Sequence, residues 1–156
     1  MRPIAPDDKA MLQAGVAALS PESAYGRFLT GKSSLTPAEL RYLTEIDGID
    51  HIALVVLDRD GGMVAVGRMV RDKTRPDTAE LAVVVCDAWQ RRGIARTLTR
   101  ELTLRSGVDR VSGTMLATNR AALALMRGIG PLERSAMSSG VREVVARVGA
   151  DIALAA

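Results

Sequence analysis

The chain has 156 residues, of which 47% are hydrophobic and 25% charged, a composition typical of one globular domain whose core buries about 70% of the unfolded surface. Its single cysteine, Cys86, excludes an internal disulfide and a multi-cysteine metal site and favours a reducing compartment, so we expect a cytoplasmic protein that binds no metal. The net charge of +3 is spread along the chain, and there is neither a membrane-length apolar run nor a signal-peptide pattern, which argues against nucleic-acid and membrane partners.

The first fifty residues predict a short edge strand followed by three helices, at 2–4, 6–20, 20–29 and 36–46. Ser20 and Thr36 are good N-cap residues, and each precedes a proline, which suits the first helical position. Glu39 follows Thr36 by three residues and completes a capping box. The second and third helices therefore have well-marked starts.

The middle of the chain predicts three strands joined as an antiparallel meander, at 51–58, 63–71 and 78–86. The third strand is a continuous apolar run rather than an alternating one, so we expect both of its faces to be covered. The remaining elements are an amphipathic helix, a strand, a helix capped by Asn119 and a hairpin, at 93–107, 110–117, 119–130, 132–138 and 141–148. This order predicts a single α+β (mixed α/β) domain over 1–156 rather than a doubly wound sheet.

The stretch "DAWQRRGIARTL" joins the third predicted strand to the long helix and combines the features of an anion site. The first turn of a helix presents unpaired N–H groups at the positive end of the helix dipole. Gly93 has no Cβ to block close approach, Ala95 keeps the next turn slim, and Arg91, Arg92 and Arg96 add positive charge. Three or four charge-assisted hydrogen bonds of ~1.5–3 kcal/mol each would supply much of the ~8 kcal/mol behind a micromolar ligand. The pattern favours a pyrophosphate site, although an ordinary turn eased by glycine would also satisfy it.

The same stretch resembles motif A of the GNAT family of N-acetyltransferases, Q/R-x-x-G-x-G/A, which is matched position by position by Gln90, Arg91, Arg92, Gly93, Ile94 and Ala95. Downstream, "NRAALALMRGIG" resembles that family's N-x-x-A helix, with Asn119 and Ala122 in register. The stretches "RPIAPDD", "SPESAYGRFL" and "RPDTAELAVVV" resemble the acetyltransferase module of bacterial Pat-type protein lysine acetyltransferases. The resemblance is strongest over 51–131.

The resemblance implies a GNAT-like fold, a mostly antiparallel sheet of about six to seven strands flanked by helices, in which 78–86 and 110–117 splay apart. Acetyl-CoA, as a substrate, would lie in the splay and pair with the backbone of Val83, Val84 and Val85. The amides from Arg91 to Ala95 would hold its pyrophosphate, with Gln90 and Arg96 beside them. Asn119 would reach the pantetheine arm or the sulfur.

Acetyl transfer to an amine needs a base, because a lysine ammonium must lose a proton before it can attack. Glu80 opens the third strand, where similar acetyltransferases place a base, and we expect its carboxylate to be partly desolvated. A strand-edge glutamate paired with an arginine is the alternative interpretation. His51, the one histidine, is a second candidate for a catalytic or gating role, with a structural role at the start of its strand as the alternative.

Met126 departs from the family pattern, since many relatives carry a tyrosine there as the acid for the leaving thiolate. Methionine donates no proton, but a thiolate leaves without full protonation.

We expect an acetyl-CoA-dependent N-acetyltransferase, acting on a protein lysine, as a monomer or homodimer. A small-molecule amine acetyltransferase and a catalytically weak, CoA-sensing regulatory module are the alternatives.

Overall fold

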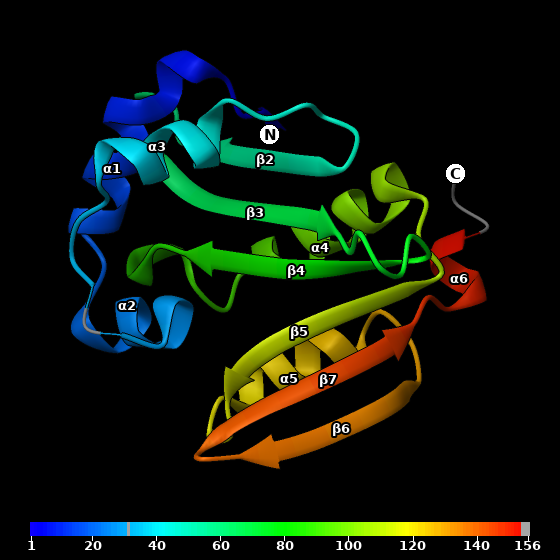
Figure 1. The fold of residues 1–156 in the computed structure, drawn as a ribbon. Coiled ribbons are helices and arrows are strands. Elements are labelled where there is room, and N and C mark those ends of the chain that lie inside the picture. Colours follow the sequence, from blue (N-terminus) through cyan, green and yellow to red (C-terminus); the bar gives the residue numbers. More distant parts are fainter. Residues whose placement is uncertain (31, 154–156) are drawn as a thin grey trace.

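The computed structural model describes residues 1–30 and 32–153, and a seven-stranded sheet lies at its centre (Figure 1). The strand order is β1-β2-β3-β4-β5-β7-β6, and each neighbouring pair is antiparallel except β4 with β5, which is parallel. The strands are β1 (Arg2–Pro3), β2 (His51–Leu57), β3 (Met63–Arg71), β4 (Thr78–Val85), β5 (Arg110–Leu116), β6 (Leu132–Ser138) and β7 (Val141–Arg147). The predicted fold class and the predicted strands are confirmed.

Helices cover both faces of the sheet: α1 (Lys9–Ala17), α2 (Pro21–Phe28) and α3 (Pro37–Thr44) lie on one face, and α4 (Ile94–Ser106) and α5 (Arg120–Arg127) on the other, with a short α6 (Ala150–Ala153) at the end (Figure 1). The predicted caps are confirmed, since the Ser20 hydroxyl accepts from the Ser23 amide and Thr36 and Glu39 form the capping box. The expected helix at 6–20 is shorter, because Pro6–Asp8 form a 3-10 turn and α1 ends at Ala17.

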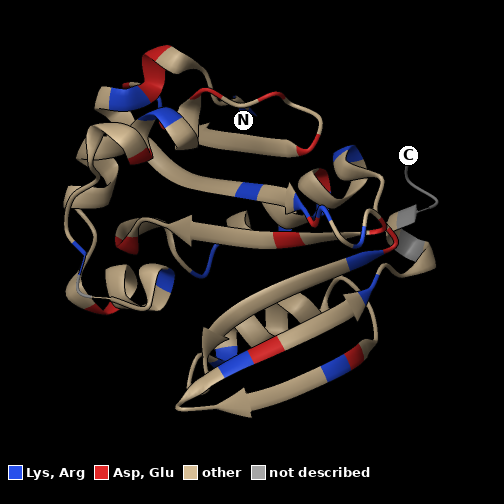
Figure 2. Ribbon diagram, in the orientation of Figure 1, with Lys and Arg blue, Asp and Glu red and all other residues tan. Residues whose placement is uncertain are grey.

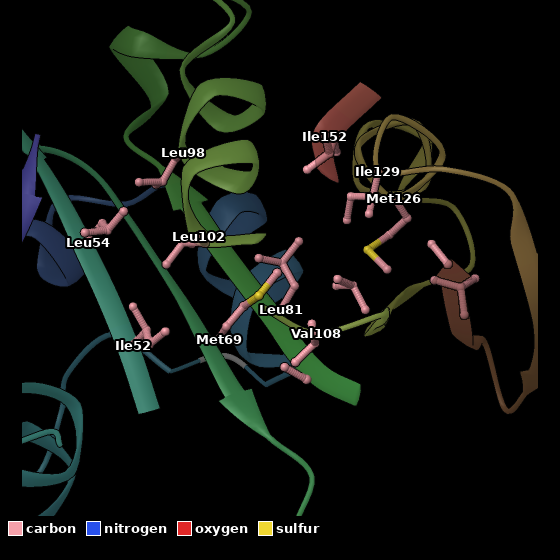
Figure 3. Close-up of a cluster of buried hydrophobic side chains, with 14 of the residues drawn as sticks. Ile52, Leu54, Met69, Leu81, Leu98, Leu102, Val108, Met126, Ile129 and Ile152 are labelled. Atoms are coloured by element: carbon pink, nitrogen blue, oxygen red, sulfur yellow. The ribbon is translucent and has the colours of Figure 1, made fainter. Parts of the chain in front are cut away.

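The main core lies between the sheet and α4 (Figure 3). Leu98 and Leu102 of α4 are fully buried, and burial of such a side chain contributes roughly 1.5–3 kcal/mol. Gly67 of β3 permits this close approach, because a Cβ there would lie 2.8 Å from Leu102 Cδ1 and 2.9 Å from Leu98 Cδ2. The helix that follows the arginine-rich loop is thereby fixed against the middle of the sheet.

The expectation that both faces of β4 are covered is wrong for part of the strand. Glu80 is exposed, and Ala82, Val83 and Val85 are only half-buried. The reason is that β5 turns away from β4 after Glu80, so that the second half of the strand is paired on one edge only, with β3. Part of the apolar run, at Ala82 and Val83, therefore lines a cavity, whereas Ala79, Leu81 and Val84 are buried in the core.

Candidate functional site

The β4 and β5 strands pair over only three residues and then diverge (Figure 1). Thr78, Ala79 and Glu80 pair in parallel with Arg110, Val111 and Ser112, and no β4–β5 pair follows in the described part of the chain. A cavity of about 360 Å³ opens where they separate. Its walls come from four elements, with Gly26, Arg27, Phe28 and Leu29 from the α2 side, Glu80, Leu81, Ala82 and Val83 from β4, Gly113, Thr114 and Met115 from β5, and Asn119, Ala122, Leu125 and Met126 from the α5 side.

The second half of β4 has a free edge on the cavity side, because its strand partner there is missing among the described residues. Val83 lines the cavity, and Val84 and Val85 continue the same edge toward the arginine-rich loop. An extended chain with amide groups can add to such an edge as another strand would. The backbone of Val83, Val84 and Val85 is therefore free on this edge to pair with an extended ligand.

The loop from Gln90 to Gly93 curves its backbone through two left-handed residues, Arg91 at φ 59° and Gly93 at φ 80°. Successive amides in such a conformation form a concave anion-binding surface. Gly93 also precedes α4 as its N-cap, and no side chain caps that helix. A Cβ on Gly93 would meet no atom within 4 Å apart from its chain neighbours, so the space beside its Cα is open.

Three arginines surround this loop, and all three are exposed: Arg91, Arg92 and Arg96. The Arg92 guanidinium lies 4.9 Å from the centre of the Trp89 ring, which orients it beside the loop. The half-buried Ile94 and Ala95 form the first turn of α4. The predicted anion-site residues thus come together at one end of the groove.

Gln90 has a further role that the sequence did not indicate, since its side chain joins the loop to α2. Its Nε2 donates to Ser23 Oγ at 3.0 Å and to the Val85 carbonyl at 3.2 Å. Asp87 accepts from the Ser20 amide at 3.0 Å and from the hydroxyls of Ser20 and Ser23 at 2.8 and 2.7 Å. These hydrogen bonds hold the pKa of the Asp87 carboxyl below its usual range. The loop and the helix that walls the cavity are therefore braced together.

Asn119 is placed at the cavity by its capping role. Its Oδ1 accepts from the Ala122 amide at 2.9 Å, which leaves the Nδ2 group on the side of Gly26 in α2. The side chain is half-buried and lines the cavity. It therefore presents an N–H donor to whatever occupies the groove.

Glu80 lies at the point where the splay begins and lines the cavity, opposite Val70 on β3 and Ser112 on β5. Its expected partial desolvation is not found, because the residue is exposed where β5 turns away. Arg27 of α2 lines the same cavity; burial lowers the pKa of its guanidinium, and the charge of Glu80 opposes that shift. Glu80 forms no ion pair within the described residues, so the alternative of an arginine-paired strand-edge glutamate is not what the structure shows.

His51 lies elsewhere, outside the cavity lining. Its Nε2 lies 3.0 Å from Arg68 Nη1, which can only donate, and its ring packs 5.0 Å from that of Tyr42. Burial and the charge of Arg68 lower the pKa of His51 to about 4, while Asp47 opposes the shift. The ring is therefore neutral at pH 7, with the basic nitrogen already occupied, and it is not brought together with Glu80.

Met126 fills the floor of the cavity and is 2% exposed. A Cβ on Gly113 of β5 would lie 3.1 Å from its sulfur, so strand and thioether are in close contact. In Figure 3 the side chain lies beside Ile129 in the main core. The position expected to hold an acid thus holds an apolar packing residue.

Arg27 is a charged cavity residue that the sequence did not single out. It belongs to a predicted helix, but nothing in "YGRFL" indicates that this helix covers the end of β4. The neighbouring Gly26 is no signal either, since a Cβ there would lie at an ordinary contact distance of 3.8 Å from Asn119 Nδ2. No helix in the described ranges has the length and apolar character to cross a membrane. Those ranges also contain no cluster of three or more potential metal ligands.

A parallel pair that splays beside a left-handed amide loop at a helix N-terminus is the arrangement that the resemblance to the GNAT family implies. No protein-family model matches the sequence. The chain is 33% identical to acetyltransferase Pat of Mycolicibacterium smegmatis over 134 residues, which cover 83% of this chain and 40% of that protein. Its structure is similar to the GNAT domain of S. lividans PAT, with a TM-score of 0.84, 26% identity and coverage of 94% of this chain and 89% of that one.

The chain belongs to the GNAT family. The same fold occurs in spermidine N-acetyltransferase from Vibrio cholerae, solved with CoA and spermine, at a TM-score of 0.72 and 15% identity, with 94% of each chain covered. The chain spans about two fifths of the length of the curated relative that it matches.

Proposed function

We propose that this domain is an acetyl-CoA-dependent N-acetyltransferase that transfers an acetyl group directly to an amine, with a protein lysine side chain as the acceptor. One observation carries the proposal: the splay between β4 and β5 joins an anion-binding loop at one end to a carboxylate, Glu80, at the other. The likeness to the Pat proteins supports lysine as the acceptor. The single cysteine, half-buried and donating to the Met63 carbonyl, is consistent with a cytoplasmic location.

The donor groups along the groove match those that acetyl-CoA would need. The amides from Arg91 to Ala95 would hold the pyrophosphate, with Gln90 fixing the loop and Arg96 adding charge. The free edge at Val83, Val84 and Val85 would pair with the pantetheine arm, and the Asn119 amide would donate near the sulfur. When bound, the coenzyme supplies an acetyl thioester, whose carbonyl carbon is the electrophile.

Glu80 would act as the base, directly or through one water, and take the proton from the acceptor ammonium. The amine nitrogen then attacks the acetyl carbon and the C–N bond forms. The nitrogen gives up its second proton to solvent, and the C–S bond breaks with departure of the thiolate. Met126 cannot protonate that thiolate, so solvent would do so after departure. His51 is the second candidate base, but Arg68 already donates to its Nε2.

The test is incubation of the purified protein with acetyl-CoA and a lysine peptide, with free CoA measured by thiol titration and the product by mass spectrometry. We expect one acetyl group on the peptide for each CoA released. The buried Met126 in place of an acid is the observation that favours the CoA-sensing alternative. Tight CoA binding without acetylated product from peptides or small amines would support that alternative and contradict the proposal.

A further inference from the structure

Arg27 on the cavity wall and Arg68 on the neighbouring strand β3 form no ion pair with any carboxylate of the described residues. Charged residues are rare in the central strands (Figure 2), where β2, β3 and β4 contain only Arg68, Arg71 and Glu80. Arg71 pairs with Asp50. Arg68 is 5% exposed, and its hydrogen-bond partners among the described residues are both neutral, the Leu43 carbonyl at 3.3 Å and His51 Nε2 at 3.0 Å. Arg27 lies 5.1 Å from the centre of the Phe28 ring, and it too forms no ion pair with any described residue.

These two cations and Glu80 lie on the same face of the sheet. Glu80 pairs with Val70 and Ala82 pairs with Arg68 in the β3–β4 register, and residues two apart on a strand project to the same side. The charges also act on one another, since burial and Arg27 together lower the pKa of Arg68 to about 10. The face beneath α2 therefore has two positive charges against one negative charge.

A buried cation without an anion destabilises the protein unless another interaction compensates for the lost hydration. The coenzyme phosphates cannot supply that interaction, because their loop begins beyond Val85, and five residues of extended strand place it about 17 Å from Glu80. The remaining occupant of this end of the groove is the acceptor.

We propose that the acceptor has a carboxylate close to its reacting amine, and that Arg27 on the cavity wall binds that carboxylate while Arg68 supplies positive potential behind it. This inference rests on the proposed function, since it names the acceptor class of the same site. One carboxylate balances the excess charge, whereas a polyamine increases it. The carboxylate belongs either to an acidic residue beside the lysine of a protein or to a free amino acid.

The experiment uses acceptors that differ only in charge. Two peptides present the same lysine beside Glu or beside Gln, and a second pair compares a free amino acid with its amide. We expect kcat/KM to be at least about tenfold higher for the charged member of one pair, the size of a charge-assisted hydrogen bond. A preference in the peptide pair identifies a protein acceptor, and a preference in the amino-acid pair identifies a small one.

Variants of Arg27 test whether this residue causes the preference for the charged acceptor. In Arg27→Gln the ratio of the two kcat/KM values falls close to one, and Arg27→Lys retains part of it. Arg100→Gln is the matched control, because Arg100 is exposed on α4, on the other face of the sheet. Melting curves check that each variant is folded, and calorimetry with the acetylated peptides measures the same preference without turnover.

Two results overturn the inference alone: acetylation of both members of each pair at equal rates, or a charge preference that survives in Arg27→Gln. Absence of acetylated product from all four acceptors overturns the proposed function as well.

Discussion

Glu80 shows how the position of a residue in the sheet determines its chemistry. It is the last residue at which β4 pairs with both β3 and β5, so its carboxylate lies at the opening of the splay. In Glu80→Gln the shape is kept and the charge is lost. We expect turnover to fall by roughly 10²–10³, the effect of losing a general base. Affinity for CoA, measured by calorimetry, should stay nearly constant, because in the proposed site backbone groups elsewhere would hold the coenzyme.

The pH profile separates this role from a structural one. For the wild type, log(kcat/KM) should rise with pH through two ionisations, those of the base and of the acceptor amine, and only the second should remain in Glu80→Gln. A variant with wild-type turnover at neutral pH, or with an unaltered acidic limb, would make His51 or water the better candidate.

Gly93 provides the residue-scale test of the anion site. At φ 80° any other residue is strained, by roughly 1–2 kcal/mol, yet a Cβ there would meet no protein atom. Gly93→Ala should therefore lower stability slightly but reduce CoA affinity at least tenfold, about 1.4 kcal/mol. Gly107→Ala is the matched control, since Gly107 is also left-handed, at φ 59°, has the same open surroundings, and ends α4 far from the loop. Equal CoA affinities in the two variants would contradict the anion site.

At the scale of elements, the position of α2 depends on one carboxylate. Asp87 accepts three hydrogen bonds from Ser20 and Ser23, at the start of the helix whose other end walls the cavity. Asp87→Ala removes these bonds, each worth about 1 kcal/mol. We expect the KM for the acceptor to rise several-fold, with a smaller change in the KM for acetyl-CoA. Asp60→Ala, in the exposed turn between β2 and β3, should change neither value. Equal increases of the two KM values in Asp87→Ala would show that these hydrogen bonds hold the coenzyme loop in place instead.

The elements themselves could be predicted well from the sequence, because their signals are local. Ser20, the Thr36–Glu39 box and Asn119 all lie within three residues of the amides that they cap, and they mark the helix starts correctly. The bracing of α2 could not be predicted, since Ser20 and Asp87 are 67 positions apart. The exposure of Glu80 could not be predicted either, because it depends on where β5 leaves β4. A continuous apolar run in the sequence has the same pattern whether the strand lies in a closed core or along a groove, so the pattern does not distinguish the two.

At the scale of the whole molecule, His51 makes stability depend on pH. Its pKa is about 4 in the folded protein, below its ordinary value of 6.5, so the unfolded chain binds a proton that the folded chain does not. The free energy of unfolding should therefore be greatest above pH 6.5 and fall as the pH drops toward 4. Urea unfolding at several pH values should give a flatter dependence for His51→Gln than for the wild type. If the free energy of unfolding depends on pH equally in the wild type and in His51→Gln, folding does not lower the pKa of the His51 ring.

The short β4–β5 pairing also determines how the two parts of the sheet cooperate. Three pairs of residues are the only sheet contact between β1–β4 and β5–β7 in the described ranges. The outer part can therefore open without breaking the ladder of the inner one, and its amides would exchange hydrogen faster in the free protein. A ligand that pairs with β4 and contacts β5 takes the place of the missing ladder. Its binding energy is then shared by both parts, so that they unfold as one unit rather than in sequence.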